Sequence, residues 1–213
     1  HMLVRPPRTR LAAWTVAVVG SAVLWFSLAT PAFGASAAVN LSALQAQALT
    51  LADLPTGWVA ASGTSSGGAA QGCGGKPFGA SHRIAKVDGS FQDPSGLPEL
   101  FETIAVYRSA SSVFRYGTSA IDRCHTVSLT EGGIKLKIHV TKLAYPGGKK
   151  TAAYSLKFSV KGQTVGIDVV VEEIGNEIAQ VGVANVPGPA LSQLKQFVTE
   201  AVNKIEKSPP APG

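Results

Sequence analysis

The sequence has few of the residues from which most reactive sites are built. Only two of its 213 residues are cysteines, Cys73 and Cys124, and only 15% are charged. A redox-active cysteine pair normally has C-x-x-C spacing, and a zinc site needs more ligands than two distant cysteines. The histidines His82, His125 and His139 match no HExxH motif and no clustered ligand set. We therefore expect no metal and no cofactor.

Signatures of catalysis are also missing. Gly75 and Lys76 are followed by Pro77 rather than Ser or Thr, so the Gly-rich stretch does not match a P-loop. The many serines include no nucleophile elbow, because the one Gly-x-Ser-x-Gly match, residues 63–67, lies in a Ser- and Gly-rich stretch expected to be a loop rather than a strand-to-helix turn. Glu172 and Glu173 are adjacent, and adjacent residues of a strand point to opposite faces, so they do not share one substrate. We expect no catalytic residue and a non-enzymatic protein, with a secreted hydrolase as the least favoured alternative.

The charge balance excludes one class of partner. Lys and Arg number 19 against 13 Asp and Glu, which gives a net charge of +6. Three of the basic residues, Arg5, Arg8 and Arg10, precede the first apolar run, so the rest of the chain is only mildly basic. Charge at this level serves solubility and does not predict binding to nucleic acid.

The N-terminal part of the chain has the pattern of an export segment. The arginines are followed by an apolar run from Leu11 to Phe33 and then by small residues ending at Ala37. This order predicts a secretory signal peptide over residues 1–37. Because the run nearly reaches bilayer-spanning length, an uncleaved membrane anchor is the alternative. In both cases the globular domain, residues 38–207, is predicted to be extracytoplasmic, and no cysteine stands where a mature N-terminal lipid would be attached.

Export also bears on the cysteines. An exported chain with an even number of cysteines usually pairs them, so we predict a structural disulfide between Cys73 and Cys124. The loop that it closes has about 50 residues, for which chain-entropy estimates give about 4 kcal/mol of stabilisation.

The stretch from Ile134 to Val183 is the most informative about the fold. Apolar and polar residues alternate with period two in its first half, which is typical of antiparallel strands with one buried and one solvated face. Its third strand is mostly β-branched and is therefore expected in the centre of the sheet. A weaker hairpin precedes this stretch. The predicted strands are residues 83–91, 100–108, 134–141, 154–161, 164–172 and 177–183.

Helices are expected to cover this sheet. Asn40 can cap a short helix, and Ser109 begins an amphipathic helix that ends at Cys124. A last helix follows Pro189, and its apolar stripe is the natural cover for the apolar face of the sheet. This stripe consists of Leu191, Leu194, Val198, Ala201, Val202 and Ile205. Residues 208–213 are a Pro-rich tail expected to be disordered. The fold class is therefore α+β.

Four lysines give the most specific surface prediction. Lys135, Lys137, Lys157 and Lys161 fall on the polar faces of neighbouring predicted strands. If these strands pair, the lysines form a basic patch that suits anionic lipid headgroups, an acidic glycan or a partner protein. The alternative is a solubilising sheet face whose lysines protect an edge.

Three stretches together resemble a known group of proteins. They are the turn LTLADLPTGW, a cysteine in a Gly-rich loop, and the strand-then-helix IAVYRSASSVFRYGTSAIDRC. Over about residues 40–207, the chain resembles exported actinobacterial domains similar to the extracellular sensor domain of the PknH kinase, and LpqN-like lipoproteins of the Mog1/PsbP type. This resemblance implies an α/β sandwich with a bent antiparallel sheet and a ligand-binding cleft. The chain departs from these groups in having one predicted disulfide rather than two, and no lipidated cysteine.

These observations predict an exported, sensor-like binding domain of the cell envelope. Its expected ligand is small or lipidic and lies in a cleft between the sheet and the helices, lined by aromatic residues. The foremost of these are Trp58, Tyr107, Tyr116 and Phe158. The alternative function is an accessory or adaptor subunit, held in an envelope membrane complex by the segment from Leu11 to Phe33.

Overall fold

The computed structural model of the chain describes residues 39–61, 70–71, 80–131, 134–160, 162–186 and 191–209. Residues 1–37, predicted as a signal peptide or anchor, lie outside the described residues, as do Cys73, Lys161 and all but the first residues of the tail. Within the described ranges, no helix is both long enough and apolar enough to cross a membrane.

Among the described residues, nine strands form one sheet in the order β1-β3-β4-β9-β8-β7-β6-β5-β2. Every neighbouring pair is antiparallel, and β8 is central, as its β-branched sequence predicts. The predicted N-terminal hairpin joins the sheet through β4, which pairs with β9. The strands are β1 Val59–Ala60, β2 Ala70–Gln71, β3 Arg83–Gln92, β4 Glu99–Tyr107, β5 Thr126–Glu131, β6 Ile134–Lys142, β7 Thr151–Val160, β8 Gln163–Ile174 and β9 Glu177–Asn185. The sequence did not predict β1, β2 or β5.

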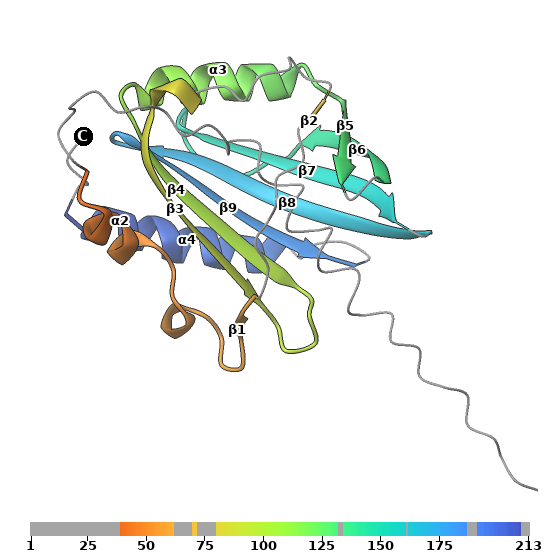
Figure 1. Cartoon of the computed structure of the whole chain (residues 1–213), viewed down its shortest axis with the longest axis horizontal. Helices are drawn as coiled ribbons and strands as arrows, with labels where there is room; N and C mark the ends of the chain where they lie inside the picture. The colour runs from red at the N-terminus through yellow and green to blue at the C-terminus, as the bar shows by residue number, and fades with distance from the viewer. Residues whose placement is uncertain are drawn as a thin grey trace, which may run out of the picture.

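Helices cover both faces of the sheet. The described helices are α2 Leu41–Gln47, α3 Ala110–Asp122 and α4 Leu191–Lys207, with short 3-10 turns η1 Leu51–Asp53 and η2 Ala80–His82. Asn40 caps α2 as predicted, because its side-chain oxygen accepts a hydrogen bond from the Ala43 N–H at 3.1 Å. Figure 1 shows α3 on one side of the sheet and α4 with α2 on the other. The α+β class is thereby confirmed.

The face that we call the α3 face carries the alternating apolar residues of β6 and β7. Ile138, Tyr154 and Phe158 pack there in one buried cluster with Val113 and Phe114 of α3. The prediction that α4 covers these residues is wrong, because α3 packs against them. The two amphipathic helices have equally clear apolar stripes, and alternation along a strand does not indicate which of them covers which face.

The opposite face, the α4 face, is apolar where β4, β9 and β8 cross it. Leu100, Val170 and Val181 pack there against Leu194 and Phe197 of α4. The central strands are thus buried on both faces, and the sheet is not one-sided as the alternation predicted. The alternation holds only towards β5 and β6, where the α4 face becomes polar and exposed.

The chain between α2 and β1 also packs on the α4 face. Leu44 lies against Ile104 and Ile205. Further along, Trp58 meets Phe197 of α4 edge to face, with ring centroids 5.2 Å apart at 71°. This segment therefore closes one side of the core beside α4.

Candidate functional site

The candidate site is the polar half of the α4 face. Here β6 and β7 pair so that His139 lies opposite Lys157, and β5 pairs with β6 so that Ser128 lies opposite Lys137. Residues two apart on a strand share a face, so Lys135 joins them. All four basic side chains are exposed. We call Lys135, Lys137, His139 and Lys157 the basic strand face.

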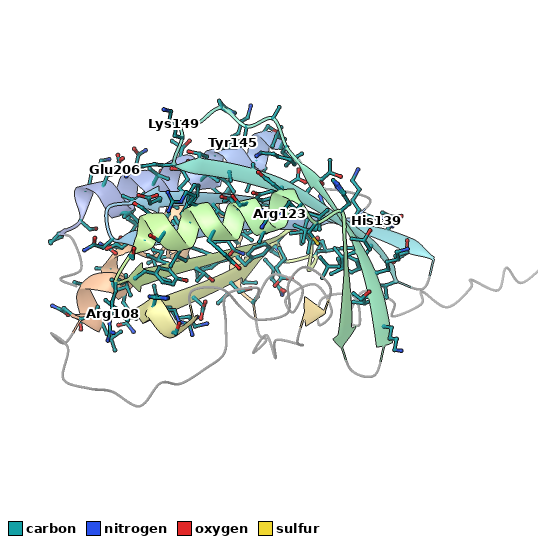
Figure 2. All side chains as sticks on the ribbon, turned by 90° about the horizontal axis from the view of Figure 1, so that it is seen from above. Arg108, Arg123, His139, Tyr145, Lys149 and Glu206 are labelled. Carbon is teal, nitrogen blue, oxygen red and sulfur yellow. The ribbon has the colours of Figure 1, made fainter. Side chains whose placement is uncertain are left out.

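Strand geometry sets the spacing of these groups. Positions directly opposite on paired strands are about 5 Å apart, and positions two apart along a strand are about 7 Å apart. Figure 2 shows His139 on the β5–β6 part of the sheet, where these strands turn steeply away from β8. The basic strand face is therefore a grid of positive groups on a turned end of the sheet rather than one enclosed charge.

No acid interrupts the exposed part of this grid. On β6, the residues on this face are Lys135, Lys137, His139 and Thr141. On β7, the exposed residues on this face are Lys157 and Ser159. The nearest acid on the same face is Asp168 of β8, which lies opposite Ser155 and is 6% exposed. An anion that approaches the face therefore meets positive groups and hydroxyls first.

Asp168 has the environment of a structural acid beneath this face. Burial raises its pKa above the ordinary value, although a hydrogen bond with Ser155 and the charge of Lys157 act in the opposite direction. Its Oδ1 atom is buried and has no hydrogen-bond partner. Because Asp168 is only 6% exposed, it lies beneath the basic strand face rather than on the surface that an anion meets.

The structure brings together three of the four predicted basic-patch lysines, namely Lys135, Lys137 and Lys157. Lys161 lies outside the described residues. His139, which the sequence analysis treated as part of a solvated sheet face, lies among them. The alternation of side chains along each strand and the pairing of successive strands were sufficient to place these side chains on one face.

The four aromatic residues predicted to line a cleft do not gather in one place. Trp58 packs on the α4 face, whereas Tyr107 and Phe158 are buried in the core of the α3 face. Tyr116 lies on α3 and is 55% exposed. These four side chains therefore do not form the common lining that the sequence analysis expected, because three of them fill the core on two sides of the sheet.

Cys124 is 9% exposed and lies two residues after the end of α3. Its Sγ atom lies 3.4 Å from the carbonyl oxygen of Thr126. Its predicted partner Cys73 lies outside the described residues, so their pairing stays a prediction.

Several buried acids were missed from the sequence, and the least exposed of them is Glu102. Glu102 of β4 faces inward between Leu100 and Ile104, and is 1% exposed. Its Oε2 atom accepts a hydrogen bond from the Leu49 N–H at 2.7 Å, and its Oε1 atom has no hydrogen-bond partner. Burial raises its pKa to about 7. The signal was present in the sequence, because an acid interrupts the apolar positions of an alternating strand.

Within the described ranges, no group of three or more His, Cys, Asp or Glu side chains is placed to hold a metal ion.

Comparison with known proteins gives likeness in structure only. No protein-family description and no curated protein matches the sequence. Among solved structures, the chain is similar to the extracellular domain of PknH from Mycobacterium tuberculosis, with 12% identity, a TM-score of 0.49, and coverage of 60% of this chain and 66% of that one. It is also similar to CalU16 from Micromonospora echinospora, with 13% identity, a TM-score of 0.27, and coverage of 59% and 86%. The chain thus spans about two thirds of the PknH domain, and neither likeness assigns a role to a residue here.

Proposed function

We propose that this chain is an extracytoplasmic, non-enzymatic and sensor-like binding domain that holds anionic lipid headgroups on its basic strand face. The observation that carries the proposal is the gathering of Lys135, Lys137, His139 and Lys157 on one exposed face without an exposed acid among them. The export pattern of residues 1–37 supports a location at the outer side of a membrane. The proposal includes a sandwich of the Mog1/PsbP type, which fits a sheet with helices on both faces.

A lipid surface suits this face better than a small ligand does. Sites for small molecules are concave and bury most of the ligand, whereas these basic side chains are exposed. A membrane surface presents many phosphates in one plane, and each lysine near an anionic surface contributes about 1 kcal/mol. Three lysines therefore supply about 3 kcal/mol, which is enough for reversible adhesion when a second attachment supports it.

Vesicle sedimentation with the full chain tests this function. The vesicles are phosphatidylcholine alone, or phosphatidylcholine mixed with phosphatidylglycerol, so any insertion of the apolar run from Leu11 to Phe33 contributes to both. We expect binding to the anionic vesicles to exceed binding to the neutral ones, and this excess to fall as salt is added. The triple variant Lys135→Gln, Lys137→Gln and Lys157→Gln should lose the excess by about 100-fold.

A matched variant distinguishes this face from general positive charge. Lys149, Lys195 and Lys207 are also exposed but lie on the β6–β7 connection and on α4. Their triple replacement by Gln changes the net charge by the same amount and should leave most of the excess intact. An equal loss in both triple variants, or no preference of the unchanged chain for anionic vesicles, contradicts the proposed function.

A further inference from the structure

The chain between α2 and β1 is tied to the domain by polar contacts as well as by packing. The Gln47 amide donates to Glu177 of β9 at 3.3 Å, and the Leu49 N–H donates to Glu102 of β4 at 2.7 Å. Asp53 forms an ion pair with Lys204 of α4. These contacts connect one short segment, residues 44–58, to two strands and a helix.

Buried apolar side chains hold the same segment against the α4 face. Leu49, Leu54 and Trp58 belong to the cluster that includes Phe197 of α4, and Leu44 packs in the neighbouring cluster. Because Leu49 supplies both a buried side chain and the N–H that meets Glu102, the segment lies directly over this carboxyl group. Residues 44–58 therefore separate Glu102 from solvent.

Each element around Glu102 has a defined set of charged groups. Glu102 lies opposite Gly89 of β3 and Val181 of β9, and neither can compensate a charge. Lys86 and Asp88 of β3 point to the other face, as an ion pair. The charged groups that act on the carboxyl group of Glu102 are Asp53 of η1 and Lys204 of α4. Further away on the same face of the sheet lie Glu177 of β9 and Glu172 of β8, and Glu206 of α4 lies near Glu172.

Lys204 is held by Asp53, so it gives Glu102 little net positive charge. The two groups act on the pKa of Glu102 in opposite directions, and both effects are smaller than that of burial. One oxygen of Glu102 has no partner and the other has the Leu49 N–H. An ionised carboxylate in such a setting is stabilised only when water reaches it.

We propose that residues 44–58 form a pH-sensitive latch, which stays closed over Glu102 while this carboxyl group carries its proton and opens to hydrate the group when it ionises. Movement of this segment disturbs less structure than movement of the sheet. The segment is held by the contacts described above, whereas β4 pairs along its length with both β3 and β9.

The size of the effect follows from proton linkage. Burial raises the pKa of Glu102 from an ordinary 4.5 to about 7 in the closed latch, and a hydrated carboxyl group in the open latch has the ordinary value. The closed form binds the proton more tightly, so a rise in pH favours the open form. The opening equilibrium constant should increase about 70-fold between about pH 5 and about pH 8.

Amide hydrogen exchange of the full chain measures this opening directly, because the Leu49 N–H is itself bonded to Glu102. After correction for the intrinsic pH dependence of exchange, the Leu49 amide should lose protection by about 70-fold over this range. Amides in the middle of β8 and β9, such as those of Val169 and Val181, should keep their protection. A loss of protection at Val169 and Val181 in parallel with Leu49 would mean global unfolding and overturn the latch.

Two substitutions test the cause. Glu102→Gln keeps an oxygen for the Leu49 N–H but does not titrate, so the change at Leu49 should fall below about 2-fold. Asp53→Asn breaks the ion pair with Lys204 but keeps Glu102, so it should loosen the latch at every pH and retain most of the pH dependence. If Glu102→Gln does not fold, Glu102→Leu serves in its place. A pH dependence that survives the loss of the carboxyl group, or one absent from the unchanged chain, refutes the latch.

Discussion

Gly182 is a position where the structure predicts that one added methyl group has a large effect. This residue of β9 lies opposite Phe101 of β4, and a Cβ atom built on it would overlap the Phe101 ring. The ring is buried in the core of the α3 face, so it cannot turn aside without disturbing its neighbours. Replacing Gly182 by Ala should therefore force the ring out of place.

The magnitude follows from two opposing effects. Replacing glycine by alanine inside a strand normally stabilises a protein by about 0.5–1 kcal/mol, because the unfolded chain loses freedom. Overpacking of a core costs about 1–3 kcal/mol and sometimes more. Because a Cβ atom here meets several ring atoms at once, we expect Gly182→Ala to lower the free energy of unfolding by about 2 kcal/mol or more.

Urea unfolding measures this change as a lower midpoint with an unchanged m-value. The decisive comparison is the same substitution in a Phe101→Ala background, where the ring is gone and Gly182→Ala should be neutral or slightly stabilising. Gly148→Ala is a control, because a Cβ atom there meets nothing, and it should be neutral or stabilise the protein by up to about 1 kcal/mol. An equal cost of Gly182→Ala in both backgrounds would refute the steric explanation.

Other predictions concern the cysteines and one ion pair. The natively purified protein should have an intact mass two hydrogens below that of the dithiol, and Cys124→Ser should cost about 4 kcal/mol in urea unfolding; a dithiol mass would disprove the Cys73–Cys124 bridge. The same spectrum should begin near Ala38 if the signal peptide is cleaved, and should retain Leu11 to Phe33 if the chain is an anchored subunit. Burial raises the pKa of Asp53, but hydrogen bonds from Lys204 and Thr50 outweigh it and leave this pKa below the ordinary 3.8. Its contribution to stability should therefore be present above about pH 4 and be lost as the pH falls through the folded pKa. Acid unfolding of Asp53→Asn should lack this loss, and an unchanged acid transition would contradict it.

The strands with clear patterns were predictable because their signal is local. Period-two alternation located β6 and β7, and pairing of these successive strands then placed Lys137 and Lys157 on one face without any knowledge of the helices. The strand β5 was missed because Thr126–Glu131 contains only two apolar residues, Val127 and Leu129, so that its alternation is short. The basic strand face could therefore be predicted because β6 and β7 have the clearest alternation in the sequence.

The contacts that join distant parts of the chain were not predictable in the same way. The hydrogen bond between Leu49 and Glu102 connects positions 53 residues apart, and no local pattern indicates which backbone N–H will meet an inward-facing acid. For the same reason, the sequence does not indicate which of the helices α3 and α4 covers which face of the sheet. Both helices are amphipathic, and only the three-dimensional course of the chain decides which stripe meets which side.

The place of β9 in the sheet has a consequence for how the chain is made. The β3–β4 hairpin joins the strands from β5 to β8 only through β9, where Leu100 pairs with Val183. While the nascent chain leaves the ribosome, one edge of β4 therefore stays without its neighbour until nearly all of the chain has been synthesised. Such an exposed edge invites pairing with other chains. A chain that stops before Glu177 would keep almost every strand and yet hold two unconnected parts of a sheet, so a late stop codon would be far more damaging than its position suggests.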